Sequence, residues 1–197
     1  MTATSSNPRP GGQIRIDCLR LHGGDTAFCG PGESFLASLD ALHDVPDDIH
    51  LVVCRQEGGV ANMAEAWGKL TGRPGIGFVT RGPGATNAAI GVHTAKQDSS
   101  PMLLFVGHVR STSQGKEAFQ EIDQAAMFLP IAKAVLQPNN SDQIASVTAQ
   151  AVALTTAGRP GPVVVAIPKD VPAAPTWSEY PTEVRMRSYN PATRGPE

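Results

Sequence analysis

The chain has 197 residues, of which 41% are hydrophobic and 17% are charged, and its formal net charge at pH 7 is -2. This length allows one domain with its own core, or one domain and a tail. The low charge and the lack of a basic run exclude a nucleic-acid-binding surface. No apolar run is long enough to span a membrane.

Residues 1–12 are polar and rich in Ser, Pro and Gly, and we expect them to form a disordered N-terminal tail. They lack the apolar stretch of a secretory signal, so the expected location is the cytoplasm. The cysteines are Cys18, Cys29 and Cys54, an odd number without a C-x-x-C pair. We therefore expect small buried apolar residues and no disulfide or zinc site. The five histidines show no metal-ligand spacing.

Short apolar segments alternate with longer amphipathic ones from residue 13 to residue 171. Continuous apolar strands separated by helices are typical of a parallel sheet covered on both faces. We therefore predict a three-layer α/β/α fold with a parallel sheet of about six strands. The expected strands are residues 26–29, 50–54, 76–80, 102–106 and 163–167. The expected helices are residues 14–21, 34–43, 58–70, 82–95, 124–136 and 142–157.

The pattern ends at residue 172, where Pro, Ala, Thr and Ser dominate. Such composition is typical of a linker, and a linker normally leads to another domain. We therefore divide the chain into a tail (1–12), one α/β domain (13–171) and a linker toward an absent domain (172–197).

Three expected strands are followed by loops of unusual composition, at residues 29–33, 55–59 and 81–87. Ligands of an open parallel sheet bind beyond the carboxyl ends of its strands. A Gly-Pro-Gly sequence alone is more often a tight turn.

Glu57 is harder to dismiss as a purely structural residue, although an acidic residue in the first turn of a helix is often only a favourable dipole partner. The two glycines after it allow close approach of a bulky group, and a carboxyl group withdrawn from water can donate a proton near neutral pH.

Several common nucleotide and nucleophile motifs are incomplete. Gly77 and Gly82 have the spacing of a phosphate-binding P-loop, but Pro83 replaces its lysine. The segment 30–35 begins like a dinucleotide fingerprint, yet Pro31 lacks a backbone donor and Phe35 is bulky at the sixth position. A dinucleotide-binding dehydrogenase domain stays open as an alternative from another class, and so does a non-catalytic dimerisation module.

Residues 55–68 (Arg-Gln-Glu-Gly-Gly-Val-Ala-Asn-Met-Ala-Glu-Ala-Trp-Gly) resemble the glutamate-bearing helix of thiamine-diphosphate (ThDP) enzymes in the acetolactate synthase group. The resemblance runs in order from about residue 13 to residue 171, and several motifs at consistent spacing are far more specific than one. Its other parts are residues 79–87 (Val-Thr-Arg-Gly-Pro-Gly-Ala-Thr-Asn), 98–102 (Asp-Ser-Ser-Pro-Met), 115–123 (Gly-Lys-Glu-Ala-Phe-Gln-Glu-Ile-Asp) and 161–171 (Gly-Pro-Val-Val-Val-Ala-Ile-Pro-Lys-Asp-Val).

The resemblance implies an N-terminal pyrimidine-binding (PYR) domain. In such enzymes the glutamate at the Glu57 position hydrogen-bonds the aminopyrimidine ring and favours its imino tautomer, which takes the proton from the thiazolium carbon. By the same matching, Pro31, Gly32, Pro83 and Asn87 approach the pyrimidine ring. The carbanion chemistry belongs to the cofactor, and the protein binds and orients it.

The resemblance also implies that Phe119 and Gln120 face the reacting centre, with Phe119 lining the substrate channel and Gln120 taking part in catalysis. The expected substrate is a 2-keto acid such as pyruvate, which is decarboxylated and joined to a second carbonyl compound. A simple 2-keto acid decarboxylase, or a split enzyme of which this chain is the PYR subunit, is the alternative within the class.

The diphosphate-binding (PP) domain of the family has a Gly-Asp-Gly stretch that this chain lacks. We therefore expect Mg²⁺ to be held by the PP domain of a second subunit, in a homodimer or homotetramer, with no metal ligand in this chain. Two motifs depart from the biosynthetic synthases, which commonly have Arg-His-Glu where this chain has Arg55-Gln56-Glu57, and Pro-Gly-Gly where it has Pro31-Gly32-Glu33. These departures leave the exact substrates and the FAD requirement open.

Overall fold

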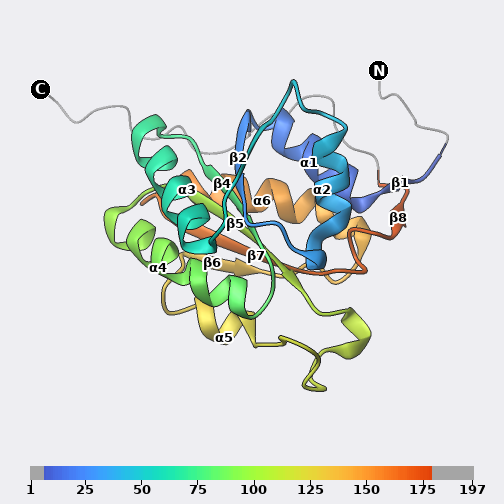
Figure 1. The fold of residues 1–197 in the computed structure, drawn as a ribbon. Coiled ribbons are helices and arrows are strands. Elements are labelled where there is room, and N and C mark those ends of the chain that lie inside the picture. The colour runs from blue at the N-terminus through green and yellow to red at the C-terminus, as the bar shows by residue number, and fades with distance from the viewer. Residues whose placement is uncertain (1–6, 179–197) are drawn as a thin grey trace, which may run out of the picture.

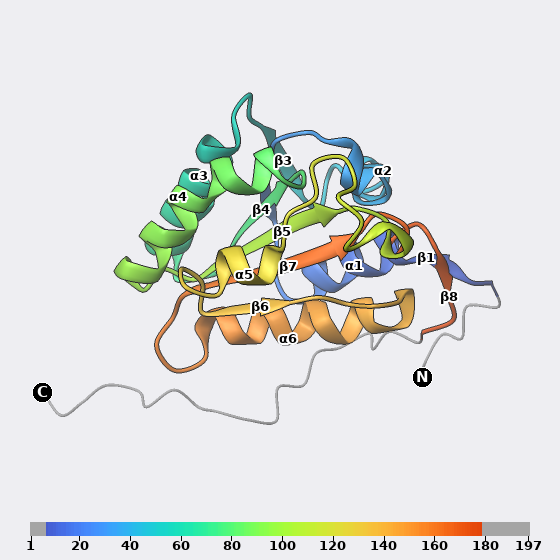
Figure 2. The ribbon, with the colours of Figure 1, turned by 90° about the horizontal axis from the view of Figure 1, so that it is seen from below.

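A computed structural model describes residues 7–178 and contains a six-stranded parallel sheet with helices on both faces (Figures 1 and 2). The strand order is β3-β2-β4-β5-β7-β6, and all neighbouring pairs are parallel. The predicted three-layer α/β/α fold is confirmed. The strands are β2 (Thr26–Cys29), β3 (His50–Val53), β4 (Gly75–Val79), β5 (Met102–His108), β6 (Ala134–Leu136) and β7 (Pro162–Pro168).

Two layers of helices cover the sheet. The first layer contains α1 (Gly11–Leu21), α2 (Leu36–His43) and α6 (Ile144–Thr156), and the second contains α3 (Glu57–Thr71), α4 (Pro83–Asp98) and α5 (Gln124–Phe128). Three short 3₁₀ helices, η1 (Glu33–Phe35), η2 (Ser111–Ser113) and η3 (Ser141–Gln143), lie in the connections. No helix among residues 7–178 is long and apolar enough to cross a bilayer.

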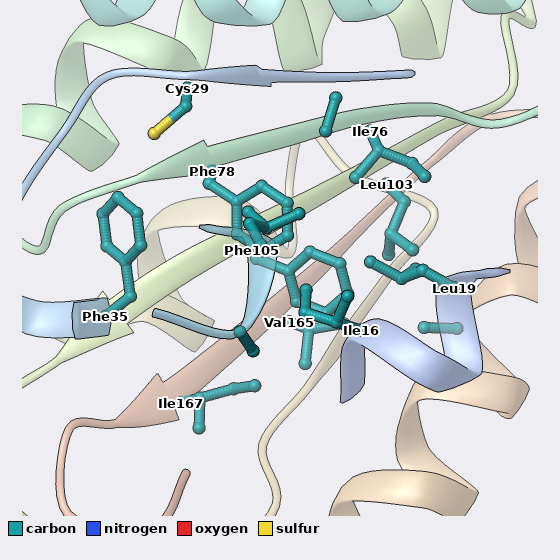
Figure 3. Packing of buried hydrophobic residues seen from close by; sticks show 14 of the residues in the cluster. Ile16, Leu19, Cys29, Phe35, Ile76, Phe78, Leu103, Phe105, Val165 and Ile167 are labelled. Carbon is teal, nitrogen blue, oxygen red and sulfur yellow. The ribbon is translucent and has the colours of Figure 1, made fainter. Parts of the chain in front are cut away.

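Alternate residues of each buried strand supply the two halves of the core, because successive side chains of a strand point to opposite faces. In β5, Leu103 and Phe105 pack with the α1 layer. Met102, Leu104 and Val106 point to the other face and pack with α3 and α4. The rings of Phe78 and Phe105 stack with centroids 4.9 Å apart (Figure 3). The central strands β4, β5 and β7 are buried along their whole length and are continuous apolar runs, whereas the edge strand β3 is partly exposed.

Local signals set the starts and ends of α3 and α4. The Gln56 side chain accepts a hydrogen bond from the Gly59 backbone N–H at 3.1 Å and so caps the start of α3. Gly72 ends that helix in the left-handed region at φ 70°. Pro83 is the first residue of α4, where its missing N–H costs no hydrogen bond. These signals place Glu57 and Pro83 at helix starts beside the sheet edge.

The prediction of one helix over residues 124–136 is wrong. The helix α5 ends at Phe128, and residues 134–136 form β6, which pairs with β7. Pro130 contributes to the break, since it lacks the N–H that would continue the hydrogen bonds of the helix. The short β6 supplies the sixth strand of the sheet.

Regular structure extends beyond the predicted domain boundaries at residues 12 and 171. Strand β1 (Arg9–Pro10) pairs antiparallel with β8 (Pro175–Thr176), and Gly11 and Gly12 belong to α1. The Gly12 N–H donates to the Pro172 carbonyl at 2.8 Å, which joins the two ends. The part of the predicted tail and linker in residues 9–12 and 172–176 is thus packed on the domain. Residues 1–6 of the tail and 179–197 of the linker lie outside the described residues.

Candidate active site

The predicted site residues lie in loops and in the first turns of α3 and α4, at one edge of the sheet. Because β3, β2, β4 and β5 are neighbours and parallel, their carboxyl ends meet at the same edge. The turn 30–32 follows β2, Glu57 lies just after β3, Pro83 follows β4, and the segment 109–123 follows β5. The fold therefore brings together loops that are far apart in the sequence.

The Glu57 carboxyl group lies between the turns after β2 and β4. A Cβ atom placed on Gly30 would lie 3.0 Å from Glu57 Cγ, and one placed on Gly84 would lie 3.4 Å from Glu57 Oε1. The Asn87 amide donates a hydrogen bond to Glu57 Oε2 at 3.0 Å. Glu57 is half-buried. Two glycines and one amide thus hold the carboxyl group while leaving it open to a ligand.

The other residues predicted to approach the ring differ in exposure. Pro31, Pro83 and Asn87 are exposed, and Gly32 is half-buried. Gly32 packs so closely on Thr80 that a Cβ atom there would lie 2.6 Å from Thr80 Cβ. The structure brings Asn87 into contact with Glu57. Pro31 follows Gly30 and Pro83 precedes Gly84, and these two glycines pack against the Glu57 side chain.

The turn after β4 depends on Gly82. Its φ of 50° lies in the region that favours glycine, and its ψ is -106°. A Cβ atom at this position would lie 2.4 Å from the Gln120 carbonyl oxygen. Gly82 is therefore the point at which the segment 109–123 contacts the turn beside Glu57.

Phe119 and Gln120 lie on an exposed segment with an unusual backbone. Phe119 is 75% exposed, and both Glu117 (φ 53°) and Gln120 (φ 61°) are in the left-handed region. The Glu121 carboxylate accepts hydrogen bonds from the Gly115 N–H at 2.6 Å and the Ala118 N–H at 3.0 Å. The Gly115 bond is the main cause of the lowered pKa of Glu121. An open hollow of about 680 Å³ lies beside the segment, and Gln120 lines it.

A buried arginine that sequence reasoning did not select anchors this segment. Arg81 is separated from the end of β4 by one residue, Thr80, and its side chain is 5% exposed. Its guanidinium forms an ion pair with Glu33, donates from Nε to the Phe119 carbonyl at 2.9 Å, and lies 5.7 Å from the centroid of the Phe119 ring. Lys169, after β7, donates to the other Glu33 oxygen at 3.2 Å. The sequence signal that could have found the Arg81–Glu33 pair is a basic residue after one strand and an acidic residue after another.

We predict that Glu33→Gln removes a small, pH-dependent part of the stability. The hydrogen bond from Arg81 is the main cause that lowers the pKa of Glu33 from its usual 4.5. A lowered folded-state pKa contributes stability that is present above the unfolded-state pKa and is lost as the pH falls through the folded-state pKa. Since the Glu33 side chain is 53% exposed, the wild type should exceed the variant by only about 0.2–1 kcal/mol at neutral pH.

Urea unfolding of both proteins from neutral pH down to about pH 3 measures this difference. The difference should vanish in the acidic range. A difference that stays constant over the whole range would show that the charge of Glu33 does not stabilise the fold.

A Cys29 nucleophile and the dinucleotide alternative fit this edge poorly. Burial is the main cause that raises the pKa of the Cys29 thiol to about 12, so it is protonated at neutral pH and a poor nucleophile. Phe35, the sixth residue of the partial dinucleotide fingerprint, is buried and its ring stacks on Phe78 with centroids 6.1 Å apart. Within residues 7–178, no cluster of three or more His, Cys, Asp or Glu could hold a metal ion.

An open parallel sheet with a half-buried carboxylate among its carboxyl-end loops defines a ligand-binding α/β domain. Residues 9–127 match the family model of the thiamine pyrophosphate enzyme N-terminal TPP-binding domain, TPP being the same compound as ThDP. The chain belongs to this family. The predicted resemblance to the acetolactate synthase group is confirmed as well.

Three curated relatives show the extent of this similarity. The acetolactate synthase large subunit of Haemophilus influenzae is 39% identical over 94% of this chain and 32% of that protein. The Escherichia coli isozyme 3 large subunit is 39% identical over 94% of the chain and 32% of its own length. The Parasynechococcus marenigrum large subunit is 40% identical over 82% of the chain and 26% of its own length. The chain thus spans about a third or less of these relatives.

The residues around Glu57 fit one end of the cofactor. The aminopyrimidine is a flat ring with polar edges, and such a ring needs a hydrogen-bonding carboxyl group beside a wall without side chains. Glu57 provides the carboxyl group, and the missing side chains at Gly30 and Gly84 leave room for it between the two turns.

Proposed function

We propose that Glu57 of this domain activates ThDP by holding its aminopyrimidine ring in an acetolactate synthase-like enzyme. The observation that supports this most directly is the position of the Glu57 carboxyl group between the Gly30 and Gly84 turns, with Oε2 bound by Asn87. When bound, ThDP supplies the carbanion that attacks a 2-keto acid. The family match and the similarity to the synthases agree with this proposal.

The residues of this chain would bind, orient and share a proton. Asn87 fixes one carboxyl oxygen of Glu57, so the other, Oε1, is directed to the edge where Gly84 lies. A carboxyl group held in one orientation can exchange a proton with a ring nitrogen at hydrogen-bond distance. Pro31, Gly32 and Pro83 would contact the flat face of the ring. Phe119 and Gln120, above the Gly82 turn, would face the substrate.

The proposed reaction joins two 2-keto acids, with pyruvate as the first candidate. Two pyruvate ions and one proton give one acetolactate ion and one CO₂. The bond between the carboxylate and the keto carbon of one pyruvate breaks, and that keto carbon forms a bond to the keto carbon of the second. We propose that Mg²⁺ and the diphosphate are held by the PP domain of a second subunit, in a homodimer or homotetramer located in the cytoplasm.

The test uses the enzyme that contains this domain together with its PP domain, supplied with ThDP, Mg²⁺ and pyruvate. We expect CO₂ release with acetolactate as the main organic product. Acetaldehyde as the main product would favour the decarboxylase alternative.

Calorimetric titration with NAD⁺ should give no binding heat, and binding of NAD⁺ without ThDP would overturn the proposal in favour of a dehydrogenase. The flavin absorbance of the purified enzyme decides whether FAD is present.

A further inference from the structure

The contacts of Arg81 are not explained by cofactor binding, since its guanidinium points away from Glu57 toward Glu33 and Phe119. An arginine that is 5% exposed loses most of its hydration, which is costly unless its donors find partners. Nη1 is buried without a hydrogen-bond partner among residues 7–178. The Glu33 carboxylate and the Phe119 carbonyl therefore carry most of the compensation for this buried charge.

Both partners of Arg81 are far from it in sequence and belong to different loops. Glu33 follows β2 and is also bound by Lys169, which follows β7. Phe119 belongs to the segment after β5. The Arg81 backbone N–H donates to Ser34 Oγ at 3.4 Å, and Ser34 Oγ is 2.7 Å from Thr80 Oγ1. Arg81, which follows β4, thus contacts the loops after β2 and β5, and Glu33 extends this link to Lys169 after β7.

The segment that Arg81 binds contains two residues in unfavourable backbone conformations. Glu117 and Gln120 hold left-handed backbone conformations, which cost energy for residues other than glycine. Within the segment, the Glu121 carboxylate binds the Gly115 and Ala118 N–H groups, and the Glu121 N–H donates to the Ala118 carbonyl at 2.8 Å, which closes a turn around residues 119 and 120. At Phe119, Arg81 supplies both a hydrogen bond to the backbone and a cation above the ring. The exposed Phe119 ring is therefore oriented largely by Arg81.

We propose that Arg81, anchored by Glu33, is a positioning residue that sets the orientation of Phe119 and Gln120 and so determines how the substrate is held for carboligation. This inference rests on the proposed function, in which these two residues face the substrate. Arg81 acts through Phe119 and does not touch Glu57 in the described contacts. Its loss should therefore affect the joining of the second substrate and leave cofactor activation intact.

The main test is Arg81→Ser in the enzyme that contains the PP domain. We expect kcat/KM for carboligation to fall roughly 10-fold to 100-fold, because misplacement of a substrate-positioning group by about 1 Å has effects of this size. The ratio of acetolactate to acetaldehyde should fall, since a displaced segment no longer holds the second keto acid. Exchange of the thiazolium proton of bound ThDP with solvent deuterium should be unchanged.

Arg73→Ser is a matched control. Arg73 makes the same three kinds of contact at the opposite edge of the sheet, with Asp25 at 2.8 Å, with the Gly23 carbonyl at 3.2 Å and with the Trp67 ring at 5.8 Å. Its loss should leave the product ratio unchanged. A product ratio that shifts equally in both variants would mean that Arg81 has only a general structural role.

Two further variants keep the test decisive if Arg81→Ser does not fold. Glu33→Gln preserves shape and removes the anchoring charge, so it should shift the product ratio in the same direction by a smaller amount. Arg81→Lys keeps the charge, but one ammonium group cannot reproduce the forked geometry of the guanidinium. Full activity of Arg81→Lys would overturn the positioning role of the guanidinium.

Amide hydrogen exchange of residues 115–121 separates this inference from the proposed function. We expect faster exchange in Arg81→Ser than in the wild type and in Arg73→Ser, because the segment loses its external support. If the wild type neither exchanges the thiazolium proton nor forms acetolactate, the proposed function fails, yet the amide exchange still decides the role of Arg81. If the wild type does both and Arg81→Ser behaves identically, only the inference on Arg81 fails.

Discussion

Replacement of Glu57 by glutamine is expected to slow exchange of the thiazolium proton of bound ThDP by roughly 100-fold to 10,000-fold, the usual contribution of a positioned proton-transfer group. Glutamine has the same shape but cannot share a carboxyl proton with the aminopyrimidine. The measurement is deuterium incorporation at the thiazolium carbon, followed by acid quench and NMR, in the enzyme that contains the PP domain. The fold should be unaffected, because Glu57 is half-buried and the Asn87 amide can donate to the new carbonyl oxygen.

Glu65→Gln is the control on the same helix. Glu65 also accepts a side-chain hydrogen bond, from Ser100 Oγ at 2.7 Å, but it is buried two turns further along α3. Exchange of the thiazolium proton should be the same in Glu65→Gln and in the wild type. Equal slowing in both variants would point to a general disturbance of α3, and undiminished exchange in Glu57→Gln would remove Glu57 from cofactor activation.

The order of strands and helices could be predicted because most elements have strong local signals. β2 matches its expected range, residues 26–29, and β3, β4, β5 and β7 differ by one or two residues at their ends. Each is an apolar run bounded by Gly, Pro or charged residues, which is typical of a strand buried on both faces. β6 was missed, because Ala134–Leu136 is too short for a periodicity argument and its pairing with β7 is a tertiary contact.

In the candidate site, too, the residues within continuous motifs could be predicted from the sequence, whereas contacts between distant loops could not. Glu57, Pro83 and Asn87 lie within continuous motifs, so the resemblance located them and the structure places Asn87 on Glu57. Arg81 is separated in the sequence by 48 positions from Glu33 and by 38 positions from Phe119, the two residues that its guanidinium binds. These pairs depend on β2, β4 and β5 being neighbours in the sheet, and strand order is not encoded in any single loop.

Arg15 is the second residue for which we expect a large effect, and the replacement Arg15→Met should stabilise the chain. Arg15 lies on the buried side of α1 and is 1% exposed. Its guanidinium lies 5.1 Å from the Phe105 ring centroid and 5.8 Å from that of Phe78. Nε and Nη2 have no hydrogen-bond partner among residues 7–178. Two aromatic rings offset only part of the cost of burying a cation, so this charge opposes folding.

Methionine keeps the length of the side chain and removes the charge. Replacing buried charges by apolar groups of similar volume often adds about 1–4 kcal/mol, and we expect a gain in this range for Arg15→Met at neutral pH in urea unfolding. The gain has a pH dependence of known sign. Burial lowers the pKa of Arg15 from 12.5 to about 9, so the unfolded chain binds more protons between these values and the wild type gains stability as the pH rises through them. The advantage of the variant should therefore be complete below about pH 9 and decrease above it.

The control for this prediction is Arg20→Met, on the same helix. Arg20 is exposed and pairs with Asp17 at 3.1 Å and with Asp48, so its loss should be neutral or slightly destabilising. Destabilisation by Arg15→Met would mean that the two aromatic rings more than compensate for the buried charge. In that case Arg15 would be an integral part of the core, because the stacked rings beneath it would then depend on the cation for their stability.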